Sequence, residues 1–252
     1  MCKKYKLTDK TIIMYGNTTL HRIQALKDFG DIKKGDLGGF VESEDNLSHY
    51  GTCWIYDNAK VYGNASVFSD AKVFENAKVL GNARVFDDAK IFGNAQVYGD
   101  ALVNGTSLVF GAALVFDNAK VYGNAKIFGN ARVFGISFVY DACVYEDAMV
   151  FDVSTVHGNA CVCGKAHIYG KACIGGNAKV SSDNDYIVFK NWWSSKRYFT
   201  WTRSNDMWTC GCFHGTGKEL IEKAYQDSEV SGREYEHVVN YVEGVKERMN
   251  KK

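Results

Sequence analysis

Two arginines and two large aromatic residues alternate along one short segment near the C-terminus of the chain. The run from 197 to 203, Arg-Tyr-Phe-Thr-Trp-Thr-Arg, has the period of two that predicts a strand with two distinct faces. The residues expected on one of these faces are Arg197, Phe199, Trp201 and Arg203. Guanidinium groups hold phosphates through paired hydrogen bonds, and aromatic planes stack on flat rings. With the neighbouring Lys196, these residues form our candidate ligand-binding site for a small, nucleotide-like molecule.

A second interpretation of the same segment stays open. Phe199 and Trp201 would form the core beneath two C-terminal helices, and Arg197 and Arg203 would lie at the rim of that core.

Cysteine and histidine side chains, which are potential ligands for a soft metal ion, gather in two places. The first set is Cys143, His157, Cys161, Cys163, His167 and Cys173, and the second is Cys210, Cys212 and His214. Neither set contains a Cys-x-x-Cys pair or an evident tetrahedral group of ligands. Alternation would place the second set on one face of one strand, which burial in a core explains equally well. We therefore predict reduced thiols and no metal site.

Catalytic motifs are absent from the sequence. There is no nucleophile elbow, P-loop or glycine-rich dinucleotide motif. His157 and His167 are the only candidates for an acyltransferase base, and sequence spacing fixes no carboxylate partner for either of them. The prediction is a protein without catalytic residues or cofactors, with an acyltransferase as the enzyme alternative.

A six-residue repeat between Ile55 and Val180 positions most of these side chains. Its plainest copies are Val-Tyr-Gly-Asn-Ala-Lys at 121–126 and Ile-Phe-Gly-Asn-Ala-Arg at 127–132. Alternation of the branched residue and Ala with outward residues predicts a short strand, and Gly-Asn predicts a tight corner. A fixed period of this kind indicates a solenoid.

This pattern resembles the hexapeptide repeat of left-handed parallel β-helices, which implies three hexads, or 18 residues, in each coil. The 22 branched positions make a little over seven coils. The step from Val139 to Val144 is five residues rather than six, which predicts one tighter corner.

Aromatic residues follow most of the branched residues, on the outside of the expected coil. Residues 18 apart should stack in columns. One column is Tyr56, Phe74, Phe92, Phe110 and Phe128, and another is Tyr62, Leu80, Tyr98, Phe116 and Phe134. At mid-prism Leu102, Leu108 and Leu114 make the usual lysine position apolar as well. Apolar ladders of this extent predict a homo-oligomer, with a trimer of parallel prisms favoured over ligand clefts between the prisms.

The flanking segments do not follow the repeat. Residues 1–50 contain an expected hairpin, Lys6 to Met14 and Thr18 to Arg22 around Tyr15-Gly16-Asn17, and are interpreted as a β cap on the solenoid at 51–182. Residues 183–252 are expected to form a small α+β module. Its expected elements are strands at 186–189, 197–202 and 208–213 and helices at 217–227 and from 232 to about 248.

The composition of the chain limits the kinds of partner that it is expected to bind. A net charge of +1 gives no indication of nucleic-acid or membrane-surface binding. The sequence has no transmembrane segment and no signal peptide, which predicts a cytosolic protein with reduced cysteines.

The order of these segments is similar to that in a family of uncharacterised phage and prophage hexapeptide-repeat proteins, often labelled polymer-forming. The phrase from Leu26 to Ser43, the repeats, and Gly211-Cys-Phe-His-Gly-Thr216 before two helices carry the resemblance. It implies a phage-encoded protein in the host cytosol and transfers no catalytic residue. The hypothesis favoured by the sequence is a non-enzymatic homotrimer that sequesters a nucleotide-derived immune signal or a host factor. The alternatives are a scaffold without a small ligand and, third, an acyltransferase.

Overall fold

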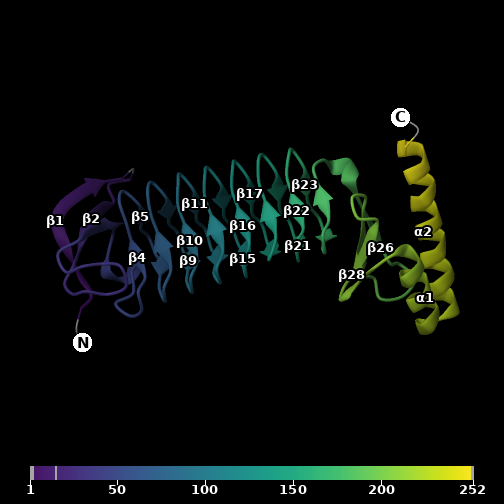
Figure 1. Cartoon of the computed structure of the whole chain (residues 1–252), viewed down its shortest axis with the longest axis horizontal. Helices are drawn as coiled ribbons and strands as arrows, with labels where there is room; N and C mark the ends of the chain where they lie inside the picture. Colours follow the sequence, from purple (N-terminus) through teal and green to yellow (C-terminus); the bar gives the residue numbers. More distant parts are fainter. Residues whose placement is uncertain (1–2, 15, 251–252) are drawn as a thin grey trace.

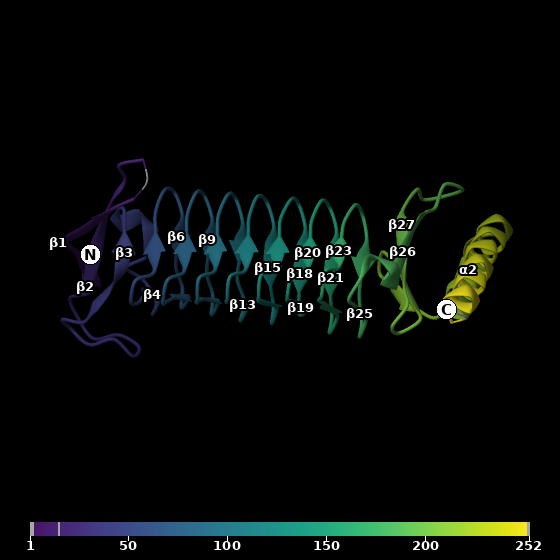
Figure 2. The same cartoon turned by 90° about the horizontal axis from the view of Figure 1, so that it is seen from above.

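The computed structural model describes residues 3–14 and 16–250, and its long central part is a three-sided parallel β-helix of about 8 turns (Figure 1, Figure 2). Most strands are two residues long, because the chain turns a corner after every hexad. Each strand pairs in parallel with the strand one coil away, as in Ile91 with Val109. The predicted fold class, a mostly β solenoid with an α+β module at its C-terminal end, is confirmed.

Three sheets form the sides of the prism, and the first also includes the N-terminal hairpin. The ten-stranded sheet consists of β1 (Tyr5–Ile13), β2 (Thr19–Ala25), β3 (Leu37–Val41), β5 (Lys60–Val61), β8 (Lys78–Val79), β11 (Gln96–Val97), β14 (Leu114–Val115), β17 (Arg132–Val133), β20 (Met149–Val150) and β23 (His167–Ile168). The eight-stranded sheet consists of β4 (Trp54–Ile55), β7 (Lys72–Val73), β10 (Lys90–Ile91), β13 (Leu108–Val109), β16 (Lys126–Ile127), β19 (Cys143–Val144), β22 (Cys161–Val162) and β25 (Lys179–Val180). The seven-stranded sheet consists of β6 (Ser66–Val67), β9 (Arg84–Val85), β12 (Leu102–Val103), β15 (Lys120–Tyr122), β18 (Phe138–Tyr140), β21 (Thr155–His157) and β24 (Cys173–Ile174).

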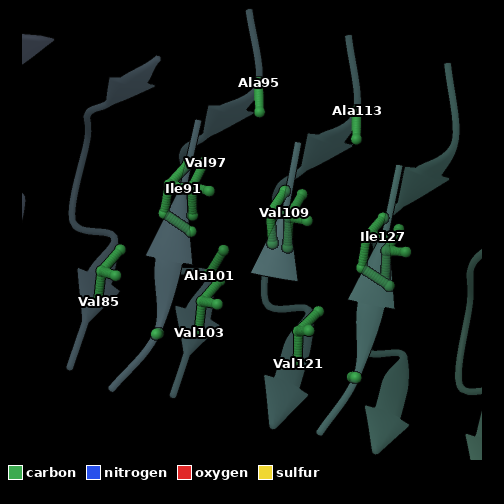
Figure 3. Packing of buried hydrophobic residues seen from close by; sticks show 14 of the residues in the cluster. Val85, Ile91, Ala95, Val97, Ala101, Val103, Val109, Ala113, Val121 and Ile127 are labelled. Atoms are coloured by element: carbon green, nitrogen blue, oxygen red, sulfur yellow. The ribbon is translucent and has the colours of Figure 1, made fainter. Parts of the chain in front are cut away.

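The interior of the prism is filled by branched residues and alanines that stack from coil to coil (Figure 3). Val103, Val121 and Ala113 are all 0% exposed. Alanine lies next to most corners, where two sheets converge, and Ser107, Ser137 and Ser154 take its place at three of them. The inward and outward positions of the hexad are therefore as predicted.

The corners depend on residues that accept a positive φ. At Gly99, φ is +71°, and a Cβ there would lie 2.8 Å from the backbone nitrogen of Asp117 in the next coil. The five-residue step between Val139 and Val144 is closed by Asp141, whose φ is 52°. One carboxylate oxygen of Asp141 accepts hydrogen bonds from both the backbone and the side-chain nitrogen of Asn124, at 2.8 and 3.0 Å. The expected tight corner is confirmed, and strand register continues past it.

The N-terminal cap begins with the predicted hairpin, β1 and β2, which pair antiparallel. Tyr15, part of the expected turn, lies outside the described residues. β3 pairs in parallel with β5, Phe40 opposite Lys60, so the stacking on this side of the prism begins before residue 51. A 3-10 turn at Glu44–Asn46 leads into the first complete coil.

The C-terminal module contains four antiparallel strands and two helices. The strands are β26 (Tyr186–Lys190), β27 (Tyr198–Thr202), β28 (Met207–Cys210) and β29 (Phe213–Gly215), one more than predicted. The expected helix at 217–227 is confirmed as α1 (Gly217–Asp227), and α2 (Glu229–Asn250) begins three residues earlier than predicted. Within the described part of the chain, neither helix has the combined length and apolar character needed to cross a bilayer.

Side-chain oxygens close the open end of the last coil. On each of the three sheets, a backbone N–H that would bind the next coil donates instead to the segment that follows. His167 N donates to Asp183 Oδ1 at 2.7 Å, Cys173 N to Thr200 Oγ1 at 2.9 Å, and Lys179 N to Ser204 Oγ at 2.6 Å. The module therefore caps the solenoid edge and prevents it from pairing with another chain.

Candidate functional site

The two aromatic residues of the predicted ligand site face the helices. Phe199 and Trp201 are 0% exposed and belong to the core of the module, together with Trp208. The indole N–H of Trp201 donates to Asp206 Oδ1 at 2.8 Å. No ligand can stack on either ring in this conformation, so their placement agrees with the core alternative that the sequence left open.

Arg197 and Arg203 are exposed and lie at opposite ends of β27. They are six positions apart along an extended chain, which corresponds to about 20 Å. The backbone N–H of Arg203 donates to the carbonyl of Asp185 at 2.8 Å, which fixes that end of the strand beside the last coil. The two guanidinium groups therefore do not converge on one phosphate, and only Arg197 lies beside Lys196.

The opposite face of β27 carries the residues that contact the solenoid. Tyr198 is half-buried there, and two residues later Thr200 accepts the hydrogen bond from the backbone N–H of Cys173. A shift of one residue along a strand exchanges its two faces. The predicted strand is present as β27, and the face to which the sequence assigned the ligand-binding role packs against the helices.

Two hollows meet at Tyr198, and we call them together the junction groove. The first, about 420 Å³, is lined by Tyr169, Gly170, Lys171, Asp183, Tyr186, Ile187, Val188 and Tyr198. The second, about 430 Å³, is lined by Val153, Lys171, Lys196, Arg197, Tyr198 and Gly211. Both hollows contain Lys171 and Tyr198, so the groove follows the boundary between the last coil and the module.

Cationic groups surround the tyrosine in the groove. The ammonium groups of Lys171 and Lys190 lie 5.1 and 5.8 Å from the centroid of the Tyr198 ring. Lys196 and Arg197 add two exposed cations to the second hollow. The only carboxylate that lines either hollow is Asp183, so the groove has an excess of positive charge that suits an anionic ligand.

An aromatic column enters the groove at its solenoid end. The rings of Phe116, Phe134, Phe151 and Tyr169 stack in succession on the ten-stranded side of the prism, with centroids 4.8, 5.0 and 5.6 Å apart. The last ring, Tyr169, is 50% exposed and lines the first hollow. Beyond it lies β26 of the module rather than another ring of the column.

Elsewhere the predicted columns form, but their rings cover one another. Phe92, Phe110 and Phe128 stack at 4.8 and 4.9 Å with interplanar angles of 3° or less. Each of these rings is half-buried, so the ring edges rather than the faces meet solvent. A planar ligand has no space between consecutive rings of such a column. Leu102, Leu108 and Leu114 lie on three different sheets, so each side of the prism carries one of these three leucines.

His167 has a carboxylate partner that the spacing of the sequence did not reveal. Its Nδ1 lies 3.1 Å from Asp183 Oδ2, and its backbone N–H binds the other oxygen of the same carboxylate. Asp183 opens the short 3-10 turn Asp183–Asp185 that follows the last coil. A carboxylate that orients an imidazole is the arrangement of a general base.

The first set of cysteines and histidines is divided among the three sheets. Cys143 and Cys161 pair in register on the eight-stranded sheet, as predicted, with Cys163 buried two residues further along. His157 and Cys173 belong to the seven-stranded sheet and His167 to the ten-stranded sheet. This separation follows from the corners between successive hexads.

The second set does not lie on one strand, and that prediction was wrong. Cys210 ends β28, and Gly211, with φ of +60°, turns the chain through Cys212 into β29, which carries His214. No group of three or more metal-ligating side chains occurs among residues 3–14 and 16–250.

On the helix side of Arg197 lies a smaller cleft of about 180 Å³, which also contains Lys223 and Tyr235. The hydroxyl of Tyr235 accepts from Asn191 Nδ2 at 3.2 Å and lies 3.6 Å from Cys210 Sγ. Burial, and then the contact with Cys210, raises the pKa of Tyr235 to about 12, so the phenol stays protonated at neutral pH.

Comparison with known proteins identifies the class of the repeat. The family model described as YdcK Beta solenoid repeat matches residues 95–111. The protein named "Uncharacterized acetyltransferase YdcK" from Escherichia coli (strain K12) is 44% identical over 41 residues, which is 16% of this chain and 13% of the relative. The match therefore spans a small part of the relative's length. The central part of this chain is similar to the β-solenoid repeats of that family.

Proposed function

We propose that this protein binds a small anionic ligand with a planar ring in the junction groove and holds it without chemical change. The observation that carries the proposal is the exposed end of an aromatic column, Tyr169, beside the cations Lys171 and Arg197. A ring that entered the first hollow would extend the stack by one step. Stacking on an aromatic side chain contributes about 1–3 kcal/mol per base. Negative groups of the same ligand would reach the lysine and the arginine.

Nucleotide-derived molecules combine a planar base with phosphates and therefore suit both parts of the groove. The resemblance to phage proteins favours a nucleotide-derived signal of host immunity as the ligand. In that setting the protein would act by sequestration and would counter host defence.

The proposed assembly is a homotrimer of parallel prisms. Its support is the row of half-buried aromatic edges along the sides of the solenoid, with one leucine on each side at mid-height. Light scattering in solution should give three times the chain mass. A monomer would refute the trimer but not the ligand site, because the junction groove lies within one chain.

Thermal-shift measurements with cyclic dinucleotides and ADP-ribose derivatives test the ligand directly. At least one of these compounds should raise the melting temperature, and Tyr169→Ala and Arg197→Ala should each weaken its binding by about tenfold or more. Arg203→Ala is the matched control for Arg197, because it removes an exposed arginine from the other end of β27. Tyr241→Ala removes a similarly exposed tyrosine from α2. If no compound shifts the melting temperature, the alternative of a scaffold without a small ligand is favoured.

An acyltransferase is the second candidate. It is favoured by the contact between His167 and Asp183 and by the name of the E. coli relative. Incubation with acetyl-CoA and a panel of amines and hydroxyl compounds should then release free coenzyme A thiol. His167→Gln should abolish that release, whereas His237→Gln, on the exposed side of α2, should not. Recovery of a bound nucleotide unchanged, without thiol release, would support sequestration instead.

A further inference from the structure

A lysine is buried at the joint between the N-terminal cap and the first coil, far from the junction groove. Lys4 is 1% exposed, immediately before β1. Its Nζ lies 2.9 Å from the carbonyl oxygen of Cys53, 3.4 Å from that of Gly51 and 3.2 Å from Cys53 Sγ. The Phe29 ring covers it, with the centroid 5.0 Å from Nζ. The lysine and the thiol are thus in direct contact and shielded from water.

The surroundings of this pair are unfavourable for charge. None of the ion pairs in the described part of the chain includes Lys4, although an ammonium group buried without a carboxylate is costly. Burial lowers the pKa of Lys4 and raises the pKa of the Cys53 thiol. Both effects favour the uncharged pair, an amine beside a thiol. The neutral amine keeps a lone pair on nitrogen and is a nucleophile.

We propose that Lys4 Nζ and Cys53 Sγ are a site of oxidative modification, in which one oxygen atom joins them as a nitrogen–oxygen–sulfur bridge. The oxidant is dioxygen, a small apolar molecule suited to an apolar interior. One N–H bond, the S–H bond and the O–O bond break, and N–O and O–S bonds form. The second oxygen atom leaves as water with the two hydrogens, so amine, thiol and dioxygen give the bridge and one water.

The position of the bridge gives it a structural consequence. Lys4 and Cys53 are 49 residues apart in sequence, and the hairpin β1–β2 and strand β3 lie between them. A covalent link would close this segment into a loop and hold the cap on the first coil. Reduction by a thiol would open the loop again, so the cap would be more stable under oxidising conditions.

Peptide mapping of the wild-type protein tests the proposal without any variant. Protein equilibrated with air is denatured, alkylated without reductant and digested with trypsin. We expect a linked pair of peptides that contain Lys4 and Cys53, heavier by one oxygen and lighter by two hydrogens than their sum. Trypsin should fail to cut after Lys4 in that species. Dithiothreitol should separate the peptides and restore both the cleavage and a thiol at Cys53 that can be alkylated.

Three results would overturn the proposal. These are a Cys53 that is fully alkylated after prolonged exposure to dioxygen, a disulfide between Cys53 and any other cysteine, Cys2 included, and a nitrogen–sulfur link without oxygen. As a second measurement, oxidation should raise the melting temperature of the cap by roughly 5–10 °C. The increase should persist in the Cys143→Ser/Cys161→Ser double variant, which removes the stacked thiols of the solenoid, and should vanish in Lys4→Arg. Loss of the increase in the double variant would also contradict the proposal.

Discussion

The solenoid and the C-terminal module are built by opposite strategies, although they share one chain. In the solenoid the core repeats small residues, and each side chain has the same neighbours one coil above and one coil below it. In the module the core is made of large aromatic residues such as Phe199, Trp201 and Trp208, which come from different strands and meet two helices. The solenoid resembles a one-dimensional array, whereas the module is a small globular unit.

This difference explains where chemical variety occurs. A residue that departs from the repeat perturbs the stacks on both sides of it, so most of the prism carries the same few outward residues. At the junction the repeat stops, and Asp183, Tyr198 and Arg197 come from segments free of this constraint. The candidate binding groove therefore lies at the end of the solenoid rather than along its sides.

The sharpest test of the comparison removes one large ring from the module. Trp201→Ala should destabilise the module by about 3–5 kcal/mol, because it empties the space of a fully buried indole. The solenoid core shares no buried residue with this cluster and should keep its protection from amide exchange. Hydrogen exchange resolved by segment would measure both units. Simultaneous loss of protection in the two would mean that they unfold as one, and the comparison would fail.

A second prediction uses two adjacent alanines of one solenoid corner. Ala113 is 0% exposed in the prism, whereas Ala112 is exposed at the corner. Ala113→Leu should cost about 1–3 kcal/mol, because the extra atoms have no space between stacked coils. Ala112→Leu should be nearly neutral by the same thermal denaturation measurement. Equal losses of stability in the two variants would contradict the view that position 113 is tightly packed and position 112 is not.

The sequence predicts the solenoid in more detail than it predicts the C-terminal module. Within the repeat, a period of six and a coil of 18 residues were sufficient to place Val121, Cys143 or Phe110 on a sheet and a face. The sequence also predicts the strand at β27, but alternation does not say which of its two faces packs against the helices and which meets the solenoid. The sequence predicts Phe199 and Trp201 as ligand contacts, but both lie in the module core, and Tyr198 on the other face lines the groove.

Contacts between segments that are distant in the chain and outside the repeat cannot be predicted from the spacing of residues. Asp183 reaches His167 because a 3-10 turn follows the last coil, and no spacing rule predicts where that turn directs a carboxylate. The proximity of Lys4 to Cys53 likewise depends on how the cap folds back on the first coil. The turn between Cys210 and His214 also escapes the sequence pattern, because Gly211 fits a continuous strand as well as a turn.

A third prediction, with a smaller expected loss of stability, concerns the contacts between the solenoid and the module. Thr200→Val keeps the shape of the side chain but leaves the backbone N–H of Cys173 without its acceptor, which should cost about 1–2 kcal/mol. Ser204→Ala removes the acceptor of Lys179 N at an exposed position, where water can replace it, and should cost less. Urea denaturation of both variants makes the comparison. A larger loss for Ser204→Ala would contradict the view that buried contacts hold the module on the prism.

The smallest expected effect is a dependence of the junction on pH. His157 ends the aromatic column of the seven-stranded sheet, stacked on Tyr140 at 5.3 Å and close to Gly175. His214 of the module lies against the adjacent Gly176. Burial, and then the nearby His214, lowers the pKa of His157 below its ordinary value of 6.5. The unfolded chain therefore binds the proton more readily than the folded chain, and stability is lost as the pH falls from 6.5 through the folded pKa.

Melting curves between pH 7 and pH 5 should show this loss in the wild-type protein. His157→Phe keeps a ring in the column and removes the titrating group, so its melting temperature should depend less on pH over that interval. His237→Gln, which removes an exposed imidazole on α2, should retain the wild-type dependence. If the melting temperature of His157→Phe depends on pH as strongly as that of the wild type, groups other than His157 cause the loss of stability. A weaker dependence in His157→Phe would show that the solenoid, regular along its length, responds to pH at the end where the repeat meets the module.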